Sequence, residues 1–281
     1  MTGELYLCST PIGNLEDITL RALRILREAD LIAAEDTRHT RKLLNHYDIN
    51  TPLTSYHEHN ARQKGAYLLE LLREGKRIAL VSDAGTPGIS DPGTLLVQQA
   101  IEAGIPITPI PGATAAVTAL SISGLATDKF VFEGFLPRSN KERKERLAKL
   151  AREERTIILY EAPHRLVATL KAICEVLPYR RMAVARELTK QYEEVIRGTT
   201  EEILAHFQIT APRGEFTLIL EGCREEEKGQ LPEEIIDPVE LVRTLEEQGF
   251  DWKAAIKEAA KRLGVPKREI YQLVKGPGGN N

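Results

Sequence analysis

The chain has 281 residues, of which 42% are hydrophobic and 28% charged, and its formal net charge is −3. This profile is that of an ordinary globular protein with room for two modest domains, and it excludes a surface that is basic throughout, so any nucleic-acid site must be local. No apolar run approaches the length of a membrane span, and the three cysteines are far apart without a CxxC pair. We therefore expect a cytoplasmic protein with reduced thiols.

Short apolar runs alternate with amphipathic helical patterns along most of the chain. Strands are expected at 4–8, 31–35, 77–82, 105–110, 129–135, 155–160, 181–187, 192–197 and 215–221. Helices between them include 60–74, 94–103, 139–152, 163–175 and 199–207. Continuous apolar strands with interposed helices predict a largely parallel sheet covered on both faces. The hairpin-like spacing of 181–197 predicts that the sheet of the second half is mixed.

The fold class predicted is α/β, with two α/β domains and a small C-terminal helical module. The first domain takes residues 1–125 and the second 126–223. Residues 224–237 carry an excess of acids, which is typical of a solvated linker. A helix-turn-helix-like module is expected over 238–276, followed by a tail at 277–281.

Three of the expected strands are followed by loops made largely of Gly, Pro, Ser and Thr: STPIGN, DAGTPGISDPG and PGAT. Ligands of open α/β sheets bind beyond the carboxyl ends of strands, where Gly allows close backbone approach and Pro fixes the bend. One such loop could be a tight turn, but three at one edge predict a small-molecule site held mainly by the main chain. No GxGxxG follows the first strand and no GxxxxGK[ST] occurs, which disfavours a Rossmann NAD site and a P-loop.

Nine motifs together resemble the ribosomal RNA small subunit methyltransferase I group of the tetrapyrrole methylase superfamily, which are class III S-adenosylmethionine-dependent methyltransferases. They are STPIGNLEDITLRAL, AEDTRHTRKLL, SYHEHN, VSDAGTPGISDPG, PGATAAVTALSISGL, FEGFLPR, YEAPHR, ARELTKQYEE and RGEFTLILEG. The resemblance covers nearly the whole chain. Its first loop reads TPIGN where the wider superfamily usually has GPGD, which suits the RNA-modifying branch and counts against a corrin or sirohaem substrate.

The resemblance implies a cofactor cleft between two domains, S-adenosylmethionine as methyl donor, and a homodimer. It also implies 2′-O-methylation of a cytidine ribose in the decoding region of small-subunit (16S) ribosomal RNA. The substrate would be that RNA or the assembled 30S subunit. Matched by motif, the implied cofactor contacts are Pro11, Ala84, Gly85, Thr86, Ile89, Thr114, Ala115, Tyr160, Glu161, Ala185 and Glu215.

A proton must leave the ribose hydroxyl, and a carboxylate, His or Lys within reach could take it. Glu187 with Lys190 in ARELTK is one candidate, and Asp36 in AEDTR is another. The alternatives are a surface ion pair for the first two and a helix cap for Asp36. It is also open whether positioning suffices without any base.

Candidate RNA contacts are spread over both halves and the C-terminal module: Arg38, His57, His59, Arg186, Lys267, Arg268 and Lys275. The two guanidinium groups suit phosphate, and the three C-terminal cations lie on or beside a helix that Pro266 opens. His57 and His59 have a spacing that could hold a metal, but the chemistry needs none, so no metal is expected. The helical module has a net charge of only +2, and a purely structural three-helix cap is the alternative.

The runner-up function is a methyltransferase of the same superfamily that acts on a tetrapyrrole or a modified protein side chain. A small-molecule methylase gains little from a second helical module, so the module favours an RNA substrate. A non-catalytic RNA-binding protein would not need the three glycine-rich loops. Aromatic residues make up only 5% of the chain, which also disfavours binding mainly by base stacking.

Overall fold

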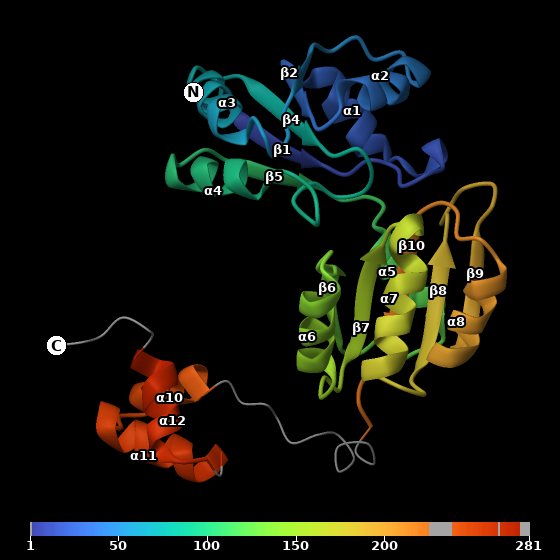
Figure 1. Cartoon of the computed structure of the whole chain (residues 1–281). Coiled ribbons are helices and arrows are strands. Elements are labelled where there is room, and N and C mark those ends of the chain that lie inside the picture. Colours follow the sequence, from blue (N-terminus) through green and yellow to red (C-terminus); the bar gives the residue numbers. More distant parts are fainter. Residues whose placement is uncertain (1, 225–237, 264, 276–281) are drawn as a thin grey trace. The chain divides into compact units, whose positions relative to one another are not determined.

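The computed structural model describes residues 2–224, 238–263 and 265–275 (Figure 1). The chain separates into two compact units that divide between residues 228 and 229. Most of the predicted linker 224–237 and all of the predicted tail 277–281 lie outside the described residues. Among the residues described, no helix is both long enough and apolar enough to cross a membrane.

The first sheet is wholly parallel, as the apolar strand pattern predicts. Its spatial order is β3-β2-β4-β1-β5. The connections that follow β1 and β2 run toward the β3 edge of the sheet, whereas those that follow β3 and β4 run toward the β5 edge. The strands are β1 (Glu4–Cys8), β2 (Leu31–Ala34), β3 (Leu53–Ser55), β4 (Arg77–Val81) and β5 (Ile107–Ile110). The helices are α1 (Leu20–Glu28), α2 (Thr37–His46), α3 (Ala61–Arg73) and α4 (Thr94–Glu102).

Alternation along the strands sends side chains to two separate cores. In β4, Ala79 and Val81 face α1 and α2, whereas Ile78 and Leu80 face α3 and α4. Because both faces are covered by helices, the strand reads as one continuous apolar run in the sequence. The short strand β3 was missed, since its three residues are only partly buried and carry no such run.

The second sheet is mixed, which confirms the prediction from the hairpin-like spacing. Its order is β6-β7-β10-β8-β9, with β6 parallel to β7 and the other pairs antiparallel. Its strands are β6 (Phe130–Phe135), β7 (Thr156–Glu161), β8 (Arg181–Arg186), β9 (Glu194–Thr199) and β10 (Phe216–Leu220). The helices here are α6 (Asn140–Leu150), α7 (Pro163–Val176) and α8 (Thr200–Ile209).

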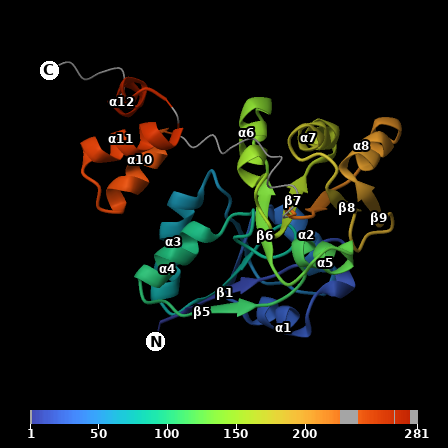
Figure 2. The same ribbon diagram turned by 90° about the horizontal axis from the view of Figure 1, so that it is seen from below.

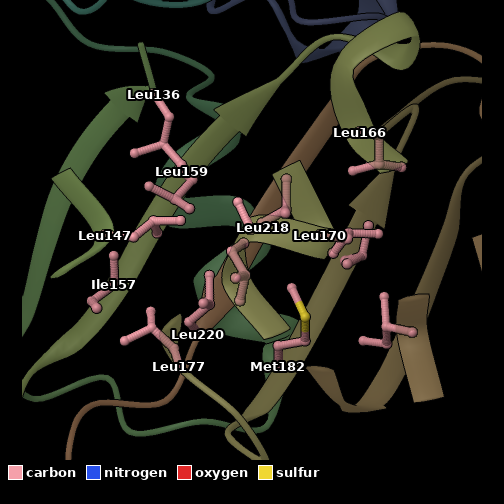
Figure 3. Close-up of a cluster of buried hydrophobic side chains, with 14 of the residues drawn as sticks. Leu136, Leu147, Ile157, Leu159, Leu166, Leu170, Leu177, Met182, Leu218 and Leu220 are labelled. Atoms are coloured by element: carbon pink, nitrogen blue, oxygen red, sulfur yellow. The ribbon is translucent and has the colours of Figure 1, made fainter. Parts of the chain in front are cut away.

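Helices α6, α7 and α8 cover one face of the second sheet, and the apolar cluster between them is drawn in Figure 3. The opposite face is covered by α5 (Ala115–Ser123), as Figure 2 shows. Helix α5 therefore packs on the second sheet although it lies within the range 1–125 assigned to the first domain. Since α5 directly follows the third glycine-rich loop, this packing ties that loop to the second sheet.

The C-terminal unit consists of α10 (Pro238–Glu247), α11 (Trp252–Leu263) and α12 (Lys267–Lys275). It has a core of its own, in which Leu245, Ile256 and Ile270 are fully or almost fully buried. The amphipathic pattern that predicts this helical module is thus explained by packing among its own three helices.

Candidate active site

The three glycine-rich loops meet at the carboxyl edge of the first sheet. Thr10 and Gly85 exchange two backbone hydrogen bonds of 2.8 and 3.1 Å, which join the first loop to the second. The hydroxyls of Ser9 and Thr86 lie 2.9 Å apart and strengthen this junction. A Cβ on Gly112 would come within 2.8 Å of Ser9 Cβ, so the third loop passes the first at a distance that only glycine permits.

These loops open onto a pocket of about 490 Å³, whose other wall comes from the second sheet. Ten of the eleven predicted cofactor residues line it: Ala84, Gly85, Thr86, Ile89, Thr114, Ala115, Tyr160, Glu161, Ala185 and Glu215. Pro11 does not line the pocket, but its neighbour Ile12 does. Gly85 has a positive φ of 79°, a conformation that favours glycine, and without a side chain it lines the pocket with its backbone.

Two residues at the end of β7 support the far wall. The Tyr160 hydroxyl accepts a hydrogen bond from the N–H of Ala116 at 3.2 Å, which fixes the start of α5, and burial raises the pKa of Tyr160. Glu161 is buried and forms an ion pair with Arg165 at 3.1 Å. Its carboxylate also accepts hydrogen bonds from Thr169 Oγ1 at 2.5 Å and from the N–H of Ala162 at 2.9 Å. Glu161 is thus held rigidly at the pocket wall.

The candidate pair Glu187 and Lys190 is brought together, but within a segment that contacts the first glycine-rich loop. We call residues 187–190 the bridge segment, because they join the half of the structure that holds the first sheet to the half that holds the second. Lys190 Nζ lies 2.9 Å from both Glu187 Oε1 and Glu215 Oε2. Burial raises the pKa of Glu187, but hydrogen bonds from Lys190 and from the N–H of Glu215 outweigh it and hold that pKa below its usual range. Burial lowers the pKa of Lys190, but hydrogen bonds to the carboxylates of Glu215 and Glu187 outweigh it and hold that pKa above its usual range. Glu187 is therefore a weak base, and Lys190 stays protonated.

The bridge segment also contacts the first loop. The N–H of Asn14 donates to Thr189 Oγ1 at 2.9 Å, and a Cβ on Gly13 would lie only 2.4 Å from Lys190 Cγ. Glu187 and Thr189 have positive φ values of 50° and 68°, a conformation that costs free energy in non-glycine residues. The strained segment and the bare glycine together allow the two halves to touch beside the pocket.

Asp36 lies outside the pocket lining and caps α2, which is the alternative considered for it from the sequence. Its side chain accepts from the N–H of Arg38 at 2.8 Å and pairs with the guanidinium of Arg38 at 2.7 Å. Hydrogen bonds from Arg38 hold the pKa of Asp36 well below its usual range. The N–H of Asp36 in turn donates to Asp83 Oδ1 at 3.0 Å, which links the end of β2 to the loop after β4.

The two arginines among the predicted RNA contacts differ in their surroundings. Arg38 is exposed beside Asp36, whereas Arg186 is tied to the carbonyl of Arg213 at 2.9 Å and to Glu194 at 3.2 Å. The backbone N–H of His57 donates to Asn60 at 2.9 Å, and the His57 and His59 rings lie 6.0 Å apart. Within the described ranges, no group of three or more His, Cys, Asp or Glu side chains could hold a metal ion.

The remaining predicted RNA contacts lie in the C-terminal unit. Lys267 and Arg268 are exposed at the start of α12. Lys275 ends that helix, and its side chain lies outside the described part of the structure.

Several pocket residues were missed from the sequence, above all Asp91, Phe135 and His164. Asp91 belongs to the second glycine-rich loop, so its place in a ligand loop was a usable signal. Phe135 and His164 come from β6 and α7, and the only signal that could have found them is their place in the family motifs FEGFLPR and YEAPHR.

The pocket suits S-adenosylmethionine by its size and by the residues that line it. Its volume lies within the range of small-molecule sites, and apolar side chains such as Ile12, Ala185 and Leu188 can flank an adenine. A Cβ on Gly85 would approach Ile12 and the carbonyl of Ala113 at 3.5 and 3.7 Å, so the loop backbone leaves room that a side chain would fill. The carboxylates in the lining suit a ligand with positive charge.

The chain is similar to known methylases in sequence and in fold. A model of the family "Tetrapyrrole (Corrin/Porphyrin) Methylases" matches residues 4–204. A Halalkalibacterium halodurans protein named "Ribosomal RNA small subunit methyltransferase I" is 53% identical over 275 residues, 96% of this chain and 94% of that protein. A Thermotoga maritima protein of the same name is 49% identical over 220 residues, 78% of this chain and 99% of its own length.

The fold is also found among solved structures. The structure of uroporphyrin-III C-methyl transferase from Thermus thermophilus complexed with S-adenyl homocysteine aligns with a TM-score of 0.56. That alignment covers 77% of this chain and 97% of the Thermus chain at 20% identity, so it shows a shared fold alone.

Proposed function

We propose that this chain, which belongs to the tetrapyrrole (corrin/porphyrin) methylase family and to its ribosomal RNA small subunit methyltransferase I group, methylates ribosomal RNA. The reaction is transfer of a methyl group from S-adenosylmethionine to the ribose 2′-hydroxyl of a cytidine in the decoding region of the small-subunit (16S) RNA. The observation that carries the proposal is the pocket of three glycine-rich loops in a chain 53% identical to a protein of that name.

The sulfonium charge of the bound donor supplies the activation of the methyl group. What the chain must add is alignment, because the ribose oxygen, the methyl carbon and the sulfur have to lie in line. The rigid junction of the first two loops, through Thr10 and Gly85, and the fixed carboxylate of Glu161 suit this task, since neither can shift without breaking hydrogen bonds. Ala84 to Thr86 and Ala185 would hold the donor mainly by backbone and apolar contact.

A basic helix beside the pocket supports an RNA acceptor. Helix α2 carries five residues of basic type and no acidic one between Thr37 and His46, and its buried residues are Thr40, Leu43 and Leu44. Arg41 and Lys42 are exposed, and no ion pair in the described structure involves them. Because β2 and β4 are parallel and paired, α2 begins at the sheet edge where the pocket loop starts. Phosphates of the acceptor strand are the natural partners of such a face.

The runner-up remains a tetrapyrrole or a modified protein side chain as acceptor. The helical module separates these possibilities less well than the sequence suggests, because the Thermotoga relative of the same name matches only 78% of this chain with 99% of its own length. The basic face of α2 is therefore the better argument for RNA, and the module is proposed to add contacts through Lys267 and Arg268.

The test is methyl transfer from labelled S-adenosylmethionine to small subunits that lack their own decoding-region methylations, with free 16S RNA in parallel. Label recovered as 2′-O-methylcytidine supports the proposal, and comparison of the two substrates shows which form is used. Subunits that already carry the modification are the matched control and should take up no label. Donor binding without label on either RNA refutes the RNA assignment and directs the search to macrocycles.

We further propose that the protein acts in the cytoplasm as a homodimer. The RNA substrate supports the first statement, and the family resemblance supports the second. Light scattering coupled to size-exclusion chromatography at working concentration tests the oligomeric state, for which a mass near twice 31.4 kDa is expected.

A further inference from the structure

Three carboxylates line the pocket, and two of them have a cation. Glu161 pairs with Arg165 at 3.1 Å, and Glu215 pairs with Lys190 at 2.9 Å. The third is Asp91, for which no ion pair is found among the described residues. A carboxylate that faces a ligand cavity without a cation keeps its lone pairs available for a proton.

Asp91 lines the pocket from a loop that also contacts the second sheet. It follows Ser90, which has a positive φ of 61°, in the loop between β4 and α4. A Cβ on Gly134, at the bulge of β6, would lie 3.0 Å from Ser90 Oγ, so this part of the loop touches the second sheet. Asp91 is thus held where the two halves meet, and it is partly exposed rather than sealed in a core.

The charges around Asp91 come from several elements. Glu35 lies at the end of β2, Asp83 lies in the same loop, and Glu215 precedes β10. Burial, and after it repulsion by these three carboxylates, raises the pKa of Asp91 to about 6, against the opposing effect of a hydrogen bond from Ser82.

Other titratable groups also face this pocket. Tyr160 on β7 senses the charge of Asp91, and Lys190 and His164 line the same wall of the second half. Lys190 is already engaged by two carboxylates and is not paired with Asp91.

We propose that Asp91 is the residue that accepts the proton of the attacking ribose 2′-hydroxyl. The assignment rests on the methyltransferase function proposed above. Lys190 is ruled out as a base because it stays protonated, and Glu187 and Asp36 are ruled out because each is bound to a cation and is a weaker base than a free carboxylate. Asp91 differs from all three, since it lines the pocket as a carboxylate without a cation.

The step is balanced as follows. The ribose oxygen forms a bond to the methyl carbon while the carbon–sulfur bond breaks, and the electron pair of that bond goes to sulfur. The sulfonium loses its charge, and the hydroxyl proton moves to a carboxylate oxygen of Asp91. The resulting carboxylic acid then gives the proton to water. A base whose pKa lies near the working pH is ionised enough to accept a proton and basic enough to hold it.

The decisive experiment is the pH dependence of single-turnover methylation at saturating donor, for wild type and Asp91→Asn. We expect the wild-type rate to rise tenfold per pH unit up to about pH 6 and then level off. Asp91→Asn should be at least about 100-fold slower above pH 6 and should lose this rise, with an unchanged Kd for S-adenosylhomocysteine by calorimetry. Asp91→Glu keeps a carboxylate and should recover part of the rate.

Glu35→Gln is the matched control, since Glu35 does not line the pocket and repels the charge of Asp91. It should keep the plateau rate and move the midpoint of the rise to lower pH. A residue with a purely structural role would not move that midpoint.

Two results would overturn the assignment. One is an Asp91→Asn enzyme within threefold of wild type with the same pH dependence. The other is an enzyme that loses only donor affinity, with its saturated single-turnover rate intact, because Asp91 would then hold the donor. If wild type methylates neither RNA, the proposed function itself fails and this assignment falls with it.

Discussion

Asp91 should make the protein less stable at neutral pH than it would be without that charge. A carboxyl whose folded-state pKa exceeds its unfolded value binds protons more tightly when folded, so unfolding releases them. Stability therefore falls as pH rises from about 4 to 6, and the full cost is present above pH 6. Replacing Asp91 by Asn removes this cost, and we expect Asp91→Asn to be more stable than wild type at pH 7.5.

The size of the gain follows from the pKa. A difference of one pKa unit corresponds to ~1.4 kcal/mol, so a rise from 3.8 to about 6 sets an upper limit of roughly 3 kcal/mol on the gain. Asp91 is partly exposed, and solvent screens its repulsion by neighbouring carboxylates. We therefore expect a gain in the free energy of unfolding of about 1 kcal/mol at pH 7.5.

Urea unfolding of wild type and Asp91→Asn between pH 4 and pH 8 measures this effect. The difference between the two proteins should be largest above pH 6 and should vanish near pH 4. Asp36→Asn provides a control of opposite sign, because Arg38 lowers the pKa of Asp36 and removal of that charge should destabilise the protein at pH 7.5. A variant at Asp91 that is equally or less stable throughout would refute the picture of an unpaired, desolvated carboxylate.

Three other predictions concern the parts that hold the site. Glu161→Gln removes the buried charge that pairs with the partly buried Arg165 and should lower the free energy of unfolding by about 3 kcal/mol, measured in urea. Gly13→Ala places a Cβ against the bridge segment and should cost about 1–3 kcal/mol while raising the Kd of the donor by calorimetry; an unchanged stability and Kd would mean that the bridge yields freely. Arg41→Glu with Lys42→Glu should raise the KM for RNA at least tenfold and flatten its salt dependence, with donor Kd unchanged.

The sequence was sufficient for the parts of the fold that depend on local pattern. Apolar runs located both sheets, and the glycine-rich loops located the pocket because Gly and Pro mark backbone that must bend or approach a ligand. Strand β3 was missed since three partly buried residues carry no periodic signal. The packing of α5 on the second sheet was also missed, because an apolar helix face does not reveal which of two sheets it will cover.

The candidate bases show a different limit. Glu187 and Lys190 stand three residues apart in an exposed-looking segment, and sequence spacing alone left open whether they form an ion pair or act on a substrate. The structure adds Glu215, 25 residues beyond Lys190, whose carboxylate accepts a hydrogen bond from the Lys190 ammonium. Lys190 is therefore paired with two carboxylates. Asp91, by contrast, lies in the loop DAGTPGISDPG, among so many turn-forming residues that the sequence gives its side chain no distinguishing feature.

What sets Asp91 apart is its burial at the pocket together with neighbouring charges that no single stretch of sequence contains. Glu35 comes from the first half and Glu215 from the second, and both raise the pKa of the same carboxyl. Gly13 and Gly134 permit close contacts between the two halves, at Lys190 and at Ser90, beside the pocket where these charges meet. Contacts between the halves therefore do more than shape the pocket: they set the basicity of a group inside it. A substitution that separates the halves should change the pH dependence of the reaction even where every pocket residue is kept.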